Sequence, residues 1–509
     1  MPFYAAATSD GSKNRFSAWL PVVTVAVTAG LTAAVSPVAA GLLIAVVLLP
    51  LLVVGKPEYV IFFLAVYTPF EEFILKWLPK GMNAPARLTG ESLIVLMFLS
   101  VIVKNLMAGR FWKRSPLDLP FTLFIGGAVV SSIVNEVPAE VAILGIKNLA
   151  RYILLFYVVY NLELPDSFWR KLVYALLAVA MFESVLAVVQ YVVGGDLFEF
   201  FKPADLVVGD STVRAIDLVS GKALGTLGRY NNLGNFLNIT ILLAMGLFYA
   251  GGEKKKVGYA AFMTVALTGL LVSFSRMSWL GMYLAFVFIL LILKKKRVIM
   301  YLLAPAAATL VLVAIFGSGL YWFKGETSKA SPIERYVAIF SGSYIDKSMK
   351  FDRLFALTVT APAIAENYLF LGLGPGTFAS DATGGGTPSR GVFPEYSHKD
   401  WLGINRTESL QYTSDQGWTS IFAQFGLVGI IAIFWAFLAL YRTASGVWRG
   451  ASDPFRKGMA LAMLGAVLLL AFQNFVSFNL TYRATSLYFW LIAGYVASVS
   501  RSEAGNEAV

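Results

Sequence analysis

The sequence predicts an all-α, polytopic membrane protein of about 12–14 transmembrane helices with one large loop outside the cytoplasm. Its 509 residues are 58% hydrophobic and 14% charged, whereas soluble domains hold about 45–50% apolar and about 25% charged residues. The mean hydropathy is +0.70. Apolar residues gather in runs of spanning length, and basic residues gather in alternate connections between them. Such a chain cannot bury its apolar surface in a core surrounded by water, which excludes a soluble fold.

Fourteen apolar runs are long enough to cross a bilayer, for which about 17–25 residues are needed. Glu71, Glu72 and Lys76 interrupt the third run, and a short turn at Ser275 and Arg276 joins the ninth and tenth runs into a predicted helical hairpin. The runs lie near residues 16–36, 38–55, 58–78, 91–108, 117–134, 141–162, 168–193, 231–250, 257–275, 277–293, 298–318, 418–441, 458–478 and 481–499.

The charges are distributed unevenly between the two sides of the predicted membrane. With the N-terminus in the cytoplasm, the cytoplasmic segments hold 21 basic and nine acidic residues, a net charge of +12. The rest of the chain holds 20 basic and 21 acidic residues, a net charge of −1. The positive-inside rule therefore predicts that both termini are cytoplasmic. Because orientation accounts for the whole surplus of the +11 chain, the charge does not indicate a nucleic-acid partner.

This topology divides the chain into three predicted parts. Residues 1–318 hold helices 1–11 and a loop at 194–230 outside the cytoplasm, and residues 418–509 hold helices 12–14 and a cytoplasmic tail. Residues 319–417 form the large loop between them. A connection of this length is unusual for a linker, so we expect it to be functional.

Composition narrows the chemistry. The chain has no cysteine, which excludes thiol catalysis, disulfides and iron–sulfur clusters, and a single histidine, His398, which excludes a multi-histidine metal site. No Asp-x-Asp motif is present, which argues against a metal-dependent nucleotide-sugar transferase. The glycines at 372, 374 and 376 superficially match a dinucleotide fingerprint, but no βαβ context surrounds them and Pro375 indicates a tight turn. We therefore expect neither a metal nor a cofactor.

Ionisable residues inside the predicted spans are functional candidates, because each centred Arg or Lys costs roughly 2.5–3.5 kcal/mol on insertion scales. Lys147 and Arg151 lie one turn apart in the sixth run, and Glu183 and Gln190 lie in the seventh. One interpretation is a buried ion pair between the two cations and Glu183 that holds the bundle together. The other is a basic pocket for an anionic ligand.

Further cations lie at the membrane edge outside the cytoplasm, where a positive-inside protein is expected to avoid arginine. Arginine presents a fork of donors that matches phosphate oxygens. Alternatively, these side chains reach lipid headgroups or water. The candidates are Lys222, Arg229, Arg276 and Arg483, together with Tyr230 and Asn231 beside Arg229.

The large loop offers further candidates. Arg353 begins an amphipathic stretch that predicts a helix on the membrane surface. His398, Glu408 and Asp415 precede the twelfth run. Asp415 suits a helix N-cap, or alternatively a general base beside an apolar entrance, and His398 is the second candidate for the base.

Four segments resemble elements of the O-antigen ligase and O-antigen polymerase superfamily. They share an order along the chain and one predicted side of the membrane, which makes the set specific. The segments are GTLGRYNNLGN at 225–235, SFSRMSWLG at 273–281, Arg353 followed by LGLGPGTF at 371–378, and WTSIFAQFGLVG at 418–429.

The resemblance implies a GT-C-like glycosyltransferase of the bacterial inner membrane that acts in the periplasm. It implies a polyprenyl-diphosphate-linked glycan as donor, a glycan or lipid A core as acceptor, contact with membrane lipids, and a chain-length regulator as a candidate partner. The expected reaction is a metal-independent, inverting transfer. Asp415 or His398 would act as the base, and Arg276 and Arg353 would stabilise the departing diphosphate. The substrate-binding residues would be Arg229, Lys222, Lys147, Arg151, Asn231, Tyr230, Arg483 and Glu408.

Two departures from the family pattern bear on the reaction. The family commonly carries arginine where this chain has Lys222, and the ligases carry a His-Asn pair where this chain has Asp415 and Gln416. The missing pair favours a polymerase over a ligase. A transporter or flippase for an anionic lipid-linked substrate is the alternative class, although no internal repeat is evident.

Overall fold

The computed structural model describes residues 53, 55–78, 83–109, 113–202, 206–208, 211–213, 222–295, 297–298, 356–378 and 417–507. The predicted first, second and eleventh spans fall almost wholly outside these residues. Most of the predicted loop at 319–417 also lies outside them, so the proposed division into three parts stays a prediction.

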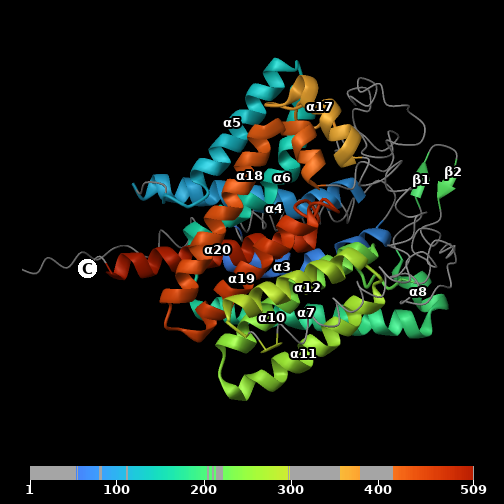
Figure 1. Ribbon diagram of the computed structural model, residues 1–509, viewed down its shortest axis with the longest axis vertical. Coiled ribbons are helices and arrows are strands. Elements are labelled where there is room, and N and C mark those ends of the chain that lie inside the picture. The colour runs from blue at the N-terminus through green and yellow to red at the C-terminus, as the bar shows by residue number, and fades with distance from the viewer. Residues whose placement is uncertain are drawn as a thin grey trace, which may run out of the picture.

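The described residues form a bundle of helices with one short hairpin of strands (Figure 1). The long helices are α3 (Pro57–Lys76), α4 (Asn83–Met107), α5 (Asp118–Val134), α6 (Ala139–Leu162), α7 (Asp166–Val193), α10 (Tyr230–Ala250), α11 (Glu253–Val272), α12 (Arg276–Ile292), α18 (Gly417–Gly450), α19 (Pro454–Gln473) and α20 (Arg483–Glu507). The shorter elements are α8 (Gly195–Phe201), the π-helix η2 (Ala356–Thr360), α17 (Ala361–Tyr368), and the antiparallel strands β1 (Leu206–Val208) and β2 (Ser211–Val213).

The predicted multi-pass helical membrane fold is confirmed. Among the described residues, seven helices are long and apolar enough to cross a membrane: α4, α6, α7, α10, α11, α18 and α19. Helices α5 and α12 are apolar but shorter. The β1–β2 hairpin in the 194–230 connection is a local exception to the all-helical expectation.

Local sequence sets several helix ends. Pro57 opens α3, where the missing N–H of proline removes no helical hydrogen bond. The Asp453 side chain accepts hydrogen bonds from the amides of Phe455 (2.7 Å) and Arg456 (3.1 Å) and so caps the start of α19. Gly194 follows α7 with φ +59°, a conformation that glycine adopts without strain.

Helices from the two halves of the chain interleave in the bundle (Figure 1). Helix α10 lies in the interior, where it packs against α7, α11, α12, α19 and α20. Helix α6 packs between α4 and α20, and α18 packs against α5 and α19. The last three helices are therefore an integral part of the same bundle as the first five described helices.

Helix α18 is interrupted at Gly426, whose backbone has φ +61° and ψ −158°. This break leaves carbonyl groups of the preceding turn without helical donors. The carbonyl oxygen of Ala423 accepts a hydrogen bond from the Leu373 amide (2.7 Å), and that of Gln424 accepts one from the Gly374 amide (3.2 Å). The segment that contains the glycine cluster therefore completes the hydrogen bonding of the broken helix.

The backbone amides that follow the break also form hydrogen bonds with residues outside the helix. The Leu427 amide donates to the Leu369 carbonyl (2.9 Å), and the Val428 amide donates to the Phe370 carbonyl (3.2 Å). Backbone polar groups at membrane depth need partners within the protein, so this exchange explains how an apolar spanning helix tolerates an interruption.

Helix α6 and the glycine cluster approach each other closely at Gly145. A Cβ atom at Gly145 would lie 2.1 Å from the Gly376 amide nitrogen, whereas a Cβ at Gly126 in α5 would meet nothing within 4 Å. We expect Gly145→Ala to lower the free energy of unfolding by about 1–3 kcal/mol through overpacking, and Gly126→Ala to leave it nearly unchanged. Chemical unfolding of the detergent-solubilised variants measures both, and equal stability of the two would contradict the close approach.

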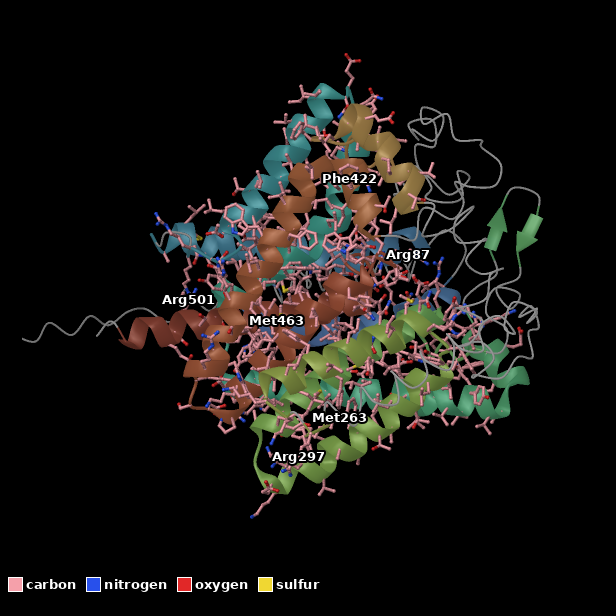
Figure 2. The ribbon with its side chains drawn as sticks, viewed as in Figure 1. Arg87, Met263, Arg297, Phe422, Met463 and Arg501 are labelled. Atoms are coloured by element: carbon pink, nitrogen blue, oxygen red, sulfur yellow. The ribbon has the colours of Figure 1, made fainter. Side chains whose placement is uncertain are left out.

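The two ends of the bundle are distinguished by the helix ends and connections that lie there. At one end, which we call the inner end, ion pairs join the connections between helices: Arg170 with Asp453 (2.8 Å), Arg456 with Asp166 (3.0 Å), and Arg501 with Glu163 (2.8 Å). The opposite end, where α10, α12 and α20 begin, is called the outer end. Arg501 and Arg87 mark the two ends in Figure 2. This grouping agrees with the alternation of charge in the sequence.

Candidate active site at the outer end

The turn that precedes α10 is tightly held. Gly225 (φ +59°) and Gly228 (φ +76°) take the left-handed conformation that glycine permits. Residues 223–228 are buried, but Arg229, which directly precedes the first residue of α10, is exposed. The Lys222 ammonium lies 3.9 Å from the centre of the Tyr230 ring, a cation–π contact. The turn therefore presents two cations at the outer end.

Helix α12 begins beside α10. It starts at Arg276, which is half-buried, and Ser275 occupies the N-cap position. The Ser275 hydroxyl donates a hydrogen bond to the Asn231 side-chain oxygen in the first turn of α10 (2.9 Å). Neither helix start has a side-chain cap. Two helix N-termini, each next to an arginine, therefore lie side by side at the outer end.

A chain of buried polar side chains continues inward from this contact. The Ser275 and Ser278 hydroxyls are 2.7 Å apart, and Ser278 donates to the Asn235 side-chain oxygen (2.7 Å). Asn235 in turn donates to the Asn479 side-chain oxygen. These bonds fix α10 and α12 to residues 474–482, which connect α19 to α20.

The same connection holds the start of α18. The Trp418 amide donates to the Asn474 carbonyl (3.0 Å), and the Asn479 amide donates to the Asn474 side-chain oxygen (3.1 Å). Sequence reasoning missed this asparagine and serine network, because short polar residues in apolar runs carry no signal of which neighbours they meet.

A second cluster of cations lies next to residues 474–482. We call Lys147, Arg151 and Arg483 the paired group, because all three contact the Glu91 carboxylate of α4. Lys147 is 2.9 Å from Glu91, Arg483 is 3.4 Å from it, and Arg151 donates to it directly. Arg483 also pairs with Glu71 of α3. Arg151 additionally donates to the Thr481 carbonyl (2.8 Å).

This arrangement corrects one prediction. One of the two interpretations paired Lys147 and Arg151 with Glu183, but the structure pairs them with Glu91, and Glu183 lies against the turn before α10. The positions of these residues in the sequence could have indicated the contact with Glu91. Glu91 opens the fourth apolar run, and Lys147 lies near the start of the sixth. Helices that alternate in direction bring both starts to the outer end.

The glycine cluster is a structural turn. Gly372, Gly374 and Gly376 have φ values of +68°, +108° and +82°. The Gly376 amide donates to the Gln424 side-chain oxygen (2.8 Å), and the amides of Leu373 and Gly374 are bound to α18. Since these amides already have protein acceptors, the segment does not cradle a phosphate, in agreement with the predicted tight turn.

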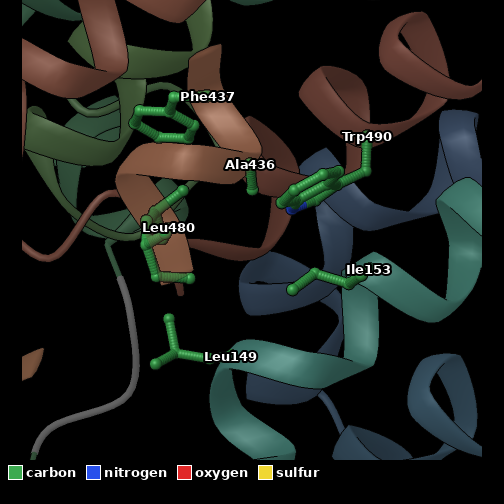
Figure 3. A pocket seen from close by; sticks show the side chains of 7 residues that line it. Leu149, Ile153, Ala436, Phe437, Leu480 and Trp490 are labelled. Carbon is green, nitrogen blue, oxygen red and sulfur yellow. The ribbon is translucent and has the colours of Figure 1, made fainter. Parts of the chain in front are cut away.

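A small cavity between α6, α18 and α20 is lined only by apolar side chains (Figure 3). Leu149 and Ile153 of α6 flank Arg151 in the sequence, and Trp490 of α20 lies opposite them. Apart from the indole N–H of Trp490, the lining side chains carry no hydrogen-bonding group, and none of them is charged. Recognition of a charged group therefore falls to the cations at the helix starts.

Some of the remaining predicted residues lie close together, and the others fall outside the described residues. Lys222, Arg229, Tyr230, Asn231 and Arg276 surround the adjacent starts of α10 and α12. We call Lys222, Arg229 and Arg276 the hairpin group. Among the described residues, Lys222 and Arg229 form no ion pair. The predicted Arg353, His398, Glu408 and Asp415 lie outside the described residues.

Comparison with known proteins assigns this region to a family. Residues 260–434, which include the start of α12 and the broken part of α18, match the family described as O-antigen ligase. The chain carries an O-antigen ligase family domain. No curated protein matches the chain.

The assignment confirms the resemblance seen in the sequence and the enzyme class. Proteins with the O-antigen ligase family domain are ligase- and polymerase-type glycosyltransferases, so this chain is an enzyme of glycan transfer. The family implies lipid-linked glycans as substrates. The domain begins within α11, and the hairpin group is therefore built partly from the domain and partly from residues 222–229 before it.

Proposed function

We propose that this protein transfers a glycan from a polyprenyl-diphosphate carrier to a glycan acceptor on the periplasmic side of the bacterial inner membrane, as a polysaccharide polymerase. The observation that carries the proposal is the pair of adjacent helix starts at the outer end. Arg229 and Arg276 lie at these helix starts. The hydrogen bond from Ser275 to Asn231 joins the start of α12 to the start of α10. Arg276 lies inside the O-antigen ligase family domain.

This arrangement suits a diphosphate for two physical reasons. The N-terminus of a helix presents unsatisfied N–H groups and a partial positive charge, which favour anions. Arginine adds a fixed charge and a fork of donors that matches phosphate oxygens. Arg229 is exposed and has no carboxylate partner among the described residues, so its charge is available to a ligand.

The proposed reaction is a metal-independent, inverting transfer. Asp415 or His398 removes the proton from the acceptor hydroxyl, and the acceptor oxygen attacks the anomeric carbon from the face opposite the carrier. The new carbon–oxygen bond forms while the bond to the diphosphate breaks, and the diphosphate keeps the electron pair. Arg276, Arg229 and Arg353 stabilise the negative charge that develops there. Attack from the opposite face inverts the anomeric configuration.

The paired group has a supporting role. Its three cations face two carboxylates, Glu71 and Glu91, so the cluster keeps one positive charge in excess. Arg151 is buried and donates through both terminal nitrogens, to Glu91 and to the Thr481 carbonyl, while the Lys147 side chain is 33% exposed. We infer that this cluster raises the positive potential around the diphosphate, and that the hairpin group contacts the diphosphate directly.

The acceptor distinguishes a polymerase from a ligase. We expect purified protein, supplied with a lipid-linked repeat unit, to produce a ladder of longer lipid-linked chains when the acceptor is a second lipid-linked repeat. Gel analysis of a parallel reaction with lipid A core as acceptor should show no product. A product on lipid A core alone would make the enzyme a ligase, and no transfer to either acceptor would contradict both.

A further inference from the structure

Two side chains of α7 hold the turn before α10 by hydrogen bonds; we call this set of contacts the grip on the turn. The Gln190 side-chain oxygen accepts hydrogen bonds from the amides of Leu224 (3.1 Å) and Gly225 (2.9 Å), and its side-chain nitrogen donates to the Gly225 carbonyl (2.9 Å). The Glu183 carboxyl group accepts from the Thr226 amide (2.8 Å) and contacts the Thr226 hydroxyl. Three consecutive residues are thus held by two side chains two helical turns apart.

The burial of Glu183 makes this grip unusual. Its relative exposure is 0%, and it lies inside a spanning helix. Among the described residues, no Lys or Arg pairs with it. An ionisable side chain at such a position is costly and marks a function by default. The Thr226 groups are its hydrogen-bond donors, so its contact is specifically with the turn.

The fit between the turn and Glu183 leaves no space for a larger residue. A Cβ atom at Gly225 would lie 2.2 Å from a Glu183 carboxyl oxygen, and Gly225 has a left-handed φ of +59°. The Thr226 hydroxyl is also 3.1 Å from the Pro69 carbonyl of α3. The turn is therefore locked between α3 and α7.

The locked residues are close in the chain to the two exposed cations. Lys222 precedes Leu224 by two residues, and Arg229 follows Thr226 by three. The Lys222–Tyr230 contact closes the turn on its outer side. Because the backbone between these positions is short and hydrogen-bonded, the geometry of residues 224–226 sets where both cations lie.

We propose that Glu183 and Gln190 are positioning residues, which fix the 224–226 turn so that Lys222 and Arg229 point toward the diphosphate of the donor. The proposal rests on the proposed function for the role of the two cations. The grip on the turn itself is independent of any substrate. Neither Glu183 nor Gln190 contacts the reacting atoms in this arrangement, because both are buried beneath the turn.

Hydrogen-bond matching determines which substitutions preserve the grip. In Glu183→Gln, the amide oxygen accepts from the Thr226 amide, and the amide nitrogen donates to the Thr226 hydroxyl, which then donates to the Pro69 carbonyl. Glu183→Ala removes both contacts and leaves the Thr226 amide without an acceptor. Ser184→Ala is a matched control, because Ser184 is equally buried but donates only to Ala180 of its own helix.

Hydrogen exchange and donor kinetics on the full-length purified protein test the proposal. We expect Glu183→Ala to speed amide exchange of residues 224–226 and to raise the donor KM by about tenfold, which corresponds to the loss of one to two buried hydrogen bonds. Glu183→Gln and Ser184→Ala should stay within about threefold of the wild type. If Glu183→Ala does not fold, Gln190→Ala serves in its place, with exchange increased at residues 224 and 225.

Several outcomes would overturn the proposal. One is wild-type exchange and kinetics in both Glu183→Ala and Gln190→Ala. Another is a Glu183→Gln variant as impaired as Glu183→Ala, because the hydrogen bonds would then not explain the effect. Exchange is measured without substrate, so it reports on the grip even if the proposed reaction is wrong. The proposed reaction fails separately if Arg229→Ala transfers glycan at the wild-type rate.

Discussion

Arg276→Ala is expected to reduce glycan transfer by about 10²–10³-fold in kcat while leaving expression and membrane insertion unchanged, because it removes one donor to the developing diphosphate charge. Arg276 begins α12 at the outer end, next to the Ser275–Asn231 contact. Arg276→Lys keeps the charge but not the planar fork, so we expect an intermediate loss. Turnover of a purified lipid-linked donor measures the effect.

Arg297 offers a matched control for this experiment. It lies at the opposite end of α12, beyond Ile292, and is exposed. We expect Arg297→Ala to retain full activity. Equal activity of Arg276→Ala and the wild type would remove Arg276 from the site, and an equal loss in Arg297→Ala would indicate an effect of net charge and not of position.

Replacing Glu91 is expected to have the largest effect on stability. The Glu91 carboxylate contacts Lys147, Arg151 and Arg483, which come from two other helices. Removing one partner of a buried ion pair typically costs about 3–5 kcal/mol, because the remaining charge is left buried. We expect Glu91→Gln to lower the free energy of unfolding by this amount, as measured by chemical denaturation of the detergent-solubilised protein.

Glu140 provides the control, since it is an exposed carboxylate in the first turn of α6 and forms no ion pair among the described residues. Glu140→Gln should change stability by at most about 0.5 kcal/mol. A second check is Glu91→Gln combined with Arg151→Met, which removes one stranded cation and should recover part of the loss. Unchanged stability of Glu91→Gln would show that the cluster is not a structural element of the bundle.

The positions of the helices were largely predictable from the sequence. The predicted run at 168–193 becomes α7 at Asp166–Val193, and the run at 231–250 becomes α10 at Tyr230–Ala250. Hydropathy works here because a spanning segment must satisfy its backbone internally and face lipid. The break at Gly426 was not predictable, because the groups that satisfy it come from residues 369–374, far away in the sequence.

The sequence predicted at which end of the bundle the candidate site lies, but it did not predict which residues contact one another there. Alternating helices place Arg229, Arg276 and Arg483 at the same end of the bundle, as expected from the charge pattern. The rotation of each helix about its axis is set by packing, and for that reason one interpretation paired Lys147 with Glu183, whereas Lys147 contacts Glu91. The contact of Glu183 with the turn depends on the same unpredicted rotation.

The proposed site is tested most directly by locating the donor diphosphate on the protein. A polyprenyl diphosphate with a photoreactive group next to the diphosphate is incubated with the purified protein, irradiated, and mapped by mass spectrometry. We expect crosslinks in residues 222–231 and 273–279, where α10 and α12 begin. Crosslinks confined to the inner-end connections at 163–170 and 451–457 would contradict the proposed site.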